Sequence, residues 1–168
     1  MPEATLRRLT LLAAITLAAA SCGDDGADTT ERDAGVYASV VLALAPGVPA
    51  AGGPVPRAGE PDGVIYTGPL DDEQPIPLEV QAAVVEDLAD VATVRFVDGR
   101  DEAIDERGEH QPVLEDGVLV LVGPVPAGNS PSVEAERYVD EDDTARVRVG
   151  LARRGDDWRV VEVEALEP

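Results

Sequence analysis

The hydrophobic and polar positions divide the body of the chain into two helical segments and a series of short strands. Residues 34–45 are mostly apolar and stop before Pro46, and Asp33 precedes them as a side chain able to cap a helix. Residues 77–90 repeat their apolar positions at helical spacing. Pro77 suits the first helical position, because the N–H that it lacks would have no partner there. Both segments are therefore predicted to be helices.

The second of these helices has an acidic side and an apolar side. The acidic side holds Glu79, Glu86, Asp87 and Asp90. The apolar side holds Leu78, Ala82, Val85 and Ala89, and it is widened by Val84 and Leu88. Because an amphipathic helix buries its apolar stripe, we expect this side to pack on a sheet.

Short apolar stretches bounded by turn-forming residues fill the rest of the chain. Strands are predicted at residues 64–67, 92–97, 119–122, 133–139, 145–151 and 158–166. The run at 119–122 is apolar at every position, which is typical of a strand buried on both faces. Val160 and Val161 are adjacent and apolar, which predicts a β-bulge that changes the phase of the last strand. Residues 140–143 and 153–157 are predicted turns.

This order of elements predicts one α+β domain at residues 34–168. We expect a mainly antiparallel sheet of about five to six strands, with the two helices packed on one face. Residues 46–63 are rich in Pro and Gly and are predicted to be a long loop, either functional or simply mobile. Residues 22–33 are polar and acidic with nothing to bury, and they are predicted to be a flexible tether.

The first residues have the pattern of an export signal. Arg7 and Arg8 precede an apolar run at residues 9–20, which suits a signal peptide and is too short to span a bilayer. Small residues then lead to Cys22, the single cysteine of the chain. An exported protein with one cysteine cannot use it for an internal disulfide, so this thiol needs another role.

The segment Ala19-Ala20-Ser21-Cys22 resembles the lipobox of bacterial lipoproteins, a family that prefers Leu where this chain has Ala19. The resemblance implies that residues 1–21 are removed and that the thiol of Cys22 receives diacylglycerol. Acyl chains such as palmitate on this residue give stable anchoring, here to the outer face of the cell membrane. Ordinary cleavage that leaves Cys22 as a free or intermolecularly paired thiol is the alternative.

Charge and composition exclude several classes of function. The chain holds 34 acidic and 13 basic residues, for a net charge of -21, so it repels nucleic acids and anionic headgroups. It has no Lys, which excludes a Schiff-base lysine, a P-loop lysine and a Ser–Lys dyad. One Cys and one His are too few for a Cys–His pair after lipidation, a zinc finger or an HExxH site. No cofactor and no metal are therefore predicted.

Carboxylates crowd the segment that follows residues 92–97. Its acidic residues are Asp98, Asp101, Glu102, Asp105 and Glu106. Paired carboxylates can act as acid and base on a glycosidic bond, and Asp98 and Asp101 are the candidates for that role. The Gly and Arg between them break the alternating ligand pattern of an EF-hand. The simpler interpretation is a solvated turn or short helix in an acidic protein.

Three further features also have a structural and a functional interpretation. Residues 140–143 form either a hairpin turn or a weak site for a divalent cation. Arg154-Gly155-Asp156 matches a tripeptide of cell-adhesion ligands, and it equally suits a hairpin turn. Trp158 is either an exposed binding platform or part of the core edge. We prefer the structural interpretation for each.

His110 is the remaining candidate for catalysis. It could serve a hydrolase with Ser39, Ser130 or Ser132, but the chain has no Gly-x-Ser-x-Gly elbow. Its neighbours Gly, Glu, Gln and Pro indicate a loop. We expect it to have no catalytic role.

Two hypotheses for the function follow. The first is a non-catalytic envelope lipoprotein that binds another envelope protein or serves as an accessory subunit. The second is a carboxylate-dependent hydrolase acting on an envelope substrate through Asp98 or Asp101. The Gly…Trp-Arg-Val-Val ending resembles small exported domains of high-GC bacteria without an assigned role, so that likeness carries no site residue over.

Overall fold

One mixed sheet and two helices make up the part of the chain that the computed structural model describes, residues 25–46 and 63–167. The helices are α1 (Asp25–Leu44) and α2 (Leu78–Leu88). The strands are β1 (Ile65–Pro69), β2 (Val94–Phe96), β3 (Val118–Val122), β4 (Ser132–Tyr138), β5 (Thr144–Arg154) and β6 (Asp157–Ala165). The predicted signal peptide, Cys22 and nearly all of the predicted 46–63 loop lie outside the described residues.

The six strands lie in the order β2-β1-β3-β4-β5-β6. β1 is parallel to β2 and β3, and the other neighbours are antiparallel. The predicted α+β class with a mainly antiparallel sheet is therefore confirmed. The predicted bulge is also present, because Gly150 is paired with Glu162 and Leu151 with Val160, which leaves Val161 as the extra residue.

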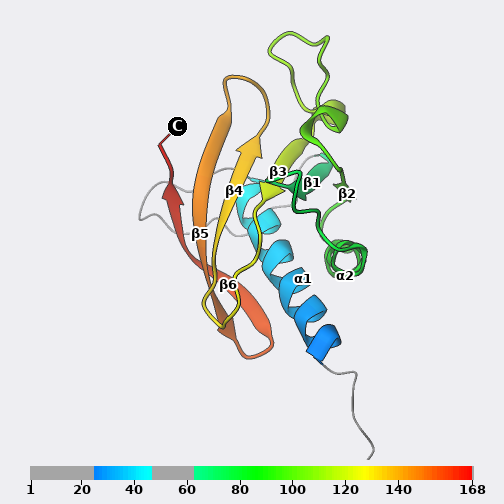
Figure 1. Cartoon of the computed structure of the whole chain (residues 1–168). Coiled ribbons are helices and arrows are strands. Elements are labelled where there is room, and N and C mark those ends of the chain that lie inside the picture. Colours follow the sequence, from blue (N-terminus) through cyan, green and yellow to red (C-terminus); the bar gives the residue numbers. More distant parts are fainter. Residues whose placement is uncertain (1–24, 47–62, 168) are drawn as a thin grey trace, which may run out of the picture.

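The main core contains buried side chains of both helices and of alternate strand positions. On β3, Val118, Val120 and Val122 belong to this core, together with Val84 of α2 and Val40 of α1. α1 contacts α2, β3 and β6, and α2 contacts β2 (Figure 1). α1 therefore lies between α2 and the far strand of the sheet, with small and apolar residues along its buried length.

The second face of β1 and β3 is covered by the connection between β2 and β3. Leu119, Leu121 and Tyr66 form a second core with Val113 and Ala103 of that connection. All five positions of β3 are consequently buried, as the apolar run at 119–122 predicts. Four residues of the connection other than glycine have positive φ: His110, Gln111, Glu115 and Asp116.

α1 begins nine residues earlier than predicted, so the expected flexible tether is wrong from Asp25 onward. Asp33 does not cap the helix; it lies inside it and accepts a hydrogen bond from Arg32 Nε at 2.8 Å. The acidic residues that suggested a solvated tether are also the type that the positive end of a helix dipole favours. Composition alone does not separate these two cases.

The buried side of α2 agrees with the prediction at Val84 and Leu88 and differs from it at the other predicted apolar positions. The helix buries Val80, Val84 and Leu88, whereas Leu78 is 77% exposed and Val85 is 42% exposed. Both sets have helical spacing, so periodicity gives two adjacent stripes. The contacts of α2 with α1 and β2 select the stripe that becomes buried.

Two neighbouring valines test this assignment directly. Val84→Ala should lower the free energy of unfolding by about 2 kcal/mol, because it removes apolar contacts from a fully buried site. Val85→Ala should change it by less than about 0.5 kcal/mol, since the side chain is half exposed and alanine favours the helix. Urea unfolding of both variants measures the difference. Equal losses would mean that Val85 is as deeply buried as Val84.

Candidate functional site

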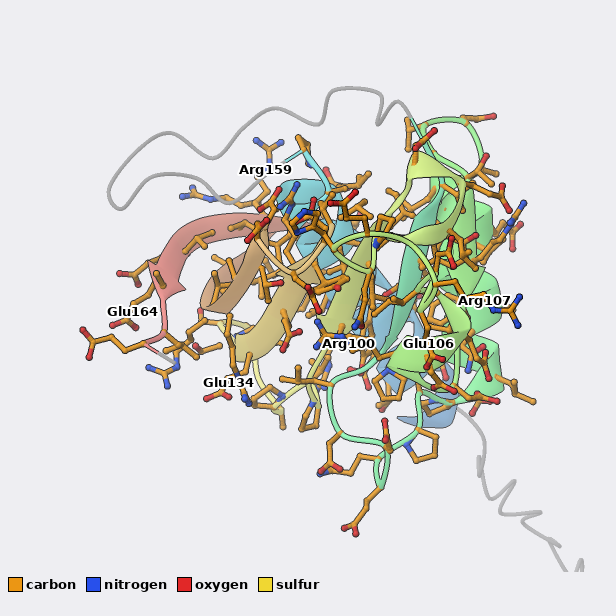
Figure 2. The ribbon with its side chains drawn as sticks, turned by 90° about the horizontal axis from the view of Figure 1, so that it is seen from above. Arg100, Glu106, Arg107, Glu134, Arg159 and Glu164 are labelled. Atoms are coloured by element: carbon orange, nitrogen blue, oxygen red, sulfur yellow. The ribbon has the colours of Figure 1, made fainter. Side chains whose placement is uncertain are left out.

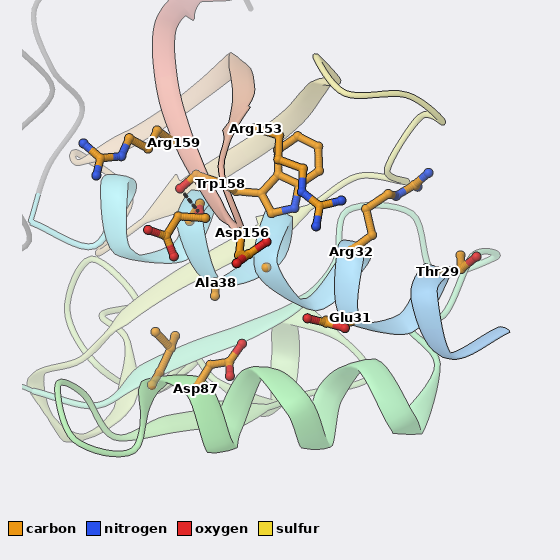
Figure 3. A pocket seen from close by; sticks show the side chains of 13 residues that line it. Thr29, Glu31, Arg32, Ala38, Asp87, Arg153, Asp156, Trp158 and Arg159 are labelled. Carbon is orange, nitrogen blue, oxygen red and sulfur yellow. Dashed lines mark hydrogen bonds between the residues drawn. The ribbon is translucent and has the colours of Figure 1, made fainter. Parts of the chain in front are cut away.

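A groove of about 890 Å³ runs along one side of α1. Its floor is the backbone and small side chains of Gly35, Ala38 and Ser39. The turn between β5 and β6 forms one wall, and Asp87 and Leu88 at the end of α2 form the other (Figure 3). The groove is open to solvent and extends over the middle of α1.

Trp158 shapes the hairpin wall. A Cβ on Gly35 would lie 2.7 Å from Cδ1 of this indole, so the glycine lets the ring rest directly on α1. The hydroxyl of Ser39 donates a hydrogen bond to the Trp158 carbonyl at 3.1 Å. Trp158 is only 9% exposed, which confirms the core-edge interpretation, although it also lines the groove.

Charges of both signs line the groove. The positive side chains are Arg32, Arg153 and Arg159, and the negative ones are Glu31, Asp87, Asp156 and Asp157. Arg32 is ion-paired with Asp33, whose Oδ1 lies 2.6 Å from Arg32 Nη2. Arg153 donates its Nε–H to the Gly155 carbonyl at 3.2 Å. Within the described residues, none of the four carboxylates and neither of the other two arginines forms an ion pair.

The outer face of the sheet is arranged differently. Glu134 on β4 pairs with Arg146 and Arg148 on β5, each at 3.3 Å, and Arg148 also reaches Glu164 on β6 at 3.3 Å. Arg100 pairs with Glu136 at 2.6 Å. Figure 2 shows other charged side chains, such as Arg107 and Arg159, projecting from different sides of the molecule. Opposite charges are thus paired across the strands but remain apart in the groove.

Asp98 and Asp101 do not share a cleft. Asp101 borders a smaller hollow with Arg100 and Tyr138, whose lining does not include Asp98. Both carboxylates are exposed, and the short 3₁₀ helix Arg100–Glu102 begins two residues after Asp98. The amide of Asp98 donates a local hydrogen bond to Glu102 Oε2 at 3.3 Å. The structure therefore gives this cluster the form of the predicted solvated turn and short helix.

The second acidic cluster is the predicted hairpin turn. Asp140 Oδ1 accepts hydrogen bonds from the amides of Asp142 and Asp143, at 2.9 and 2.8 Å. Asp143 also pairs with the buried Arg137 at 2.7 Å. Across residues 25–46 and 63–167, no group of three or more His, Cys, Asp or Glu side chains is placed to hold a metal ion.

No serine is held by His110 in the described part of the chain. His110 Nδ1 lies 3.1 Å from Asp142 Oδ2, and Nε2 lies 3.9 Å from Glu109. Ser39 bonds Trp158 instead, and Ser132 lines a separate hollow near Leu70. His110 and these serines therefore have different surroundings in different parts of the fold.

The pKa shifts outside the groove have local causes. The hydrogen bond from Arg95 lowers the pKa of the Glu115 carboxyl, and Tyr66 adds a weaker hydrogen bond at 3.3 Å. The backbone amide of Glu73 lowers the pKa of Asp71, with help from Gln74. These carboxyls are solvent-exposed, so the shifts reflect turn and strand contacts rather than a prepared acid or base.

The sequence contains signals for parts of the groove but none that joins them. The Arg154-Gly155-Asp156 turn is confirmed by the positive φ of Gly155, 67°. It is tighter than predicted, because β5 continues to Arg154 and β6 begins at Asp157. Gly35 within an otherwise apolar helical segment is the one local signal of a close approach.

Two results concern the chain as a whole. No helix among residues 25–46 and 63–167 has the length and hydropathy needed to cross a membrane. Comparison of the chain with protein-family models, curated proteins and solved structures found no significant match.

Proposed function

We propose that the protein is a lipid-anchored envelope lipoprotein whose groove binds a partner and performs no chemistry. The lipobox-like segment ending at Cys22 supports the anchor. The single observation that carries the binding role is the open groove, where among the described residues charges of both signs lie around Trp158 without ion pairs except at Arg32. Aromatic residues and arginines are the side chains that most often dominate binding energy.

The start of α1 places the groove close to the proposed anchor. Three peptide steps separate Cys22 from Asp25, and three residues span at most about 11 Å. The groove lies about ten residues along the helix, roughly 15 Å further. A lipid on Cys22 would therefore keep the groove within roughly 30 Å of the membrane surface. The partner that fits this reach is a component at or next to that membrane.

The hydrolase hypothesis is the second candidate, and no arrangement of the described residues favours it. Asp101 borders the hollow beside Arg100 and Tyr138, and Asp98 does not line it. A catalytic pair needs a shared site on both sides of a substrate bond. We therefore propose the binding role ahead of hydrolysis.

Replacing Cys22 tests the anchor. Cys22→Ser removes the thiol that would receive the lipid, so the protein should lose labelling by radioactive palmitate and leave the membrane fraction. Fractionation and labelling of wild-type and variant cells measure both. A variant that stays with the membrane as fully as the wild type, or a wild type that takes up no label, would refute the proposal.

The same cells can test whether the groove is occupied. A photo-reactive amino acid at Asp156, in the hairpin wall, should cross-link an envelope component after irradiation. The matched control carries it at Arg107, which lines none of the described cavities. Equal cross-linking from both positions would show that the groove is no special surface.

A further inference from the structure

The arginines of the groove lie on the hairpin wall and on α1, whereas the α2 wall carries Asp87 and no arginine. The hairpin wall also carries Asp156 and Asp157, so its charges are mixed. Arg153 projects from the hairpin wall next to Trp158, on the same side as Arg32, whereas Asp87 lies on α2 across the groove (Figure 3). Glu31 lies on α1 toward the α2 side. A molecule lying across the floor would meet the Arg153 guanidinium on the hairpin side, next to carboxylates, and the Asp87 carboxylate alone on the α2 side.

The charged groups of Arg153 and Asp87 would gain more from binding a ligand than from pairing with each other. Exposed ion pairs contribute little to folding, and among the described residues neither Arg153 nor Asp87 forms an ion pair. A ligand that covers the floor would exclude water. Arg153 and Asp87 could then form charge-assisted hydrogen bonds with that ligand. On the outer face of the sheet, protein side chains pair with one another. In the groove, the ligand would supply the opposite charges.

The floor adds an apolar and a hydrogen-bonding surface. Ala38 and Leu88 are apolar, and the indole of Trp158 rests against Gly35 at the base of the wall. The indole Nε1–H has no acceptor among the described residues, so it is available to a carbonyl group. Apolar contact, one donor and two opposite charges are the features that complement a peptide backbone with free or charged ends.

We propose that the groove binds a short peptide that carries both charges. A carboxylate of the peptide pairs with Arg153, a cationic group pairs with Asp87, and an apolar side chain between them packs against Trp158. This assignment rests on the proposed function, because it names the class of molecule that the binding groove accepts. A bidentate contact of the guanidinium with the carboxylate gives the site its direction.

Titration with a defined peptide tests the proposal. The probe is the tetrapeptide Lys-Ala-Leu-Ala with free ends, added to the full chain as purified from cells. Trp158 is the single tryptophan, so its fluorescence reports directly on the groove, and calorimetry on the same samples detects binding that leaves the emission unchanged. Saturable binding is expected, and amidation of the C-terminus should weaken it about tenfold, or about 1.4 kcal/mol.

Matched variants locate the two charges. Arg153→Gln should weaken binding about tenfold and abolish the effect of amidation, because both changes remove the same contact. Arg154→Gln is the control, since Arg154 lies on the same hairpin but does not line the groove. Asp87→Asn should weaken binding of the probe about tenfold. It should weaken binding much less for a control peptide that has no cationic group, because its N-terminus is acetylated and its lysine is replaced by norleucine. Asp90→Asn, just beyond α2, should not weaken it.

Several outcomes would overturn the assignment. One is no saturation by either method up to about 10 mM probe, where even weak complexes form. A second is an equal loss of peptide affinity in Arg153→Gln and Arg154→Gln. A third is that amidation of the peptide weakens binding to Arg153→Gln as much as it weakens binding to the wild type. If the groove cross-links a membrane component but ignores the peptide, the binding role survives and the ligand class is wrong. If the peptide binds but Cys22→Ser stays membrane-bound, the anchor alone fails.

Discussion

Replacing Gly117 with alanine is expected to lower the free energy of unfolding by about 3 kcal/mol, at the upper end of typical overpacking losses. A Cβ at this position would lie 2.4 Å from the carbonyl oxygen of Val64. That oxygen accepts the hydrogen bond from the Val118 amide at 3.0 Å, at the start of the β1–β3 pairing. The methyl group would also meet Tyr66 at 3.2 Å, so neither neighbour can move without disturbing buried structure.

Gly150 provides the matched control. It lies inside β5, and a Cβ there would make an ordinary contact of 3.4 Å with Cβ of Glu162. Gly150→Ala should leave stability unchanged or raise it by up to about 1 kcal/mol, because it reduces the freedom of the unfolded chain. Urea unfolding followed by circular dichroism compares the two variants. A loss below about 0.5 kcal/mol for Gly117→Ala would show that β1 and β3 tolerate a wider separation there.

Raising the pH from about 10 to 12 should destabilise the fold through Tyr37. This phenol belongs to α1 and is buried, donates a hydrogen bond to the Gly123 carbonyl at 3.4 Å, and has a pKa raised by burial to about 12. The carboxylate of Asp33, one turn earlier, contributes to the raised pKa. The folded protein therefore holds the phenolic proton more tightly than the unfolded chain does.

The sign of the effect follows from this difference. The stabilisation is fully present below the unfolded pKa, near 10, and it is lost as the pH rises toward the folded pKa of about 12. The wild type should lose about 2 kcal/mol over this interval relative to Tyr37→Phe, which cannot ionise. At pH 8 the variant should instead be the less stable protein, by about 1 kcal/mol for the missing hydrogen bond.

Urea unfolding of wild type and Tyr37→Phe at about pH 8, 10, 11 and 12 measures this linkage. Other titrating groups affect both proteins equally, so the difference between the two curves isolates Tyr37. Curves that run parallel would mean that the phenol is as accessible in the fold as in the unfolded chain. Such a result would also mean that the contact between Tyr37 of α1 and Gly123, after β3, is weak.

Gly117 and Tyr37 stabilise two parts of the scaffold that supports the groove. Gly117 fixes where β3 begins beside β1, and Tyr37 fixes α1 against Gly123, the residue that follows β3. α1 in turn carries the floor of the groove, where Gly35 lies two residues before Tyr37. Stability at these positions therefore determines whether the groove keeps its shape.

Features that depend on neighbouring residues could be predicted from the sequence alone. The apolar run at 119–122 predicted a strand buried on both faces, and the adjacent Val160 and Val161 predicted the bulge. Gly155 predicted the turn, because glycine adopts positive φ without a steric penalty. In each case the backbone geometry or the hydrophobic period is encoded within a few positions of the chain.

Features that depend on contact between distant segments emerged only in the folded chain. Two stripes of α2 have helical spacing, and docking on α1 and β2 buried the one with Val84 rather than Val85. The groove combines residues 29–39, 87–88 and 153–159, which no local pattern joins. The positions of the groove walls in the fold decide which of its charges can act on the same ligand. An interaction between charges depends on their separation in space and not along the chain.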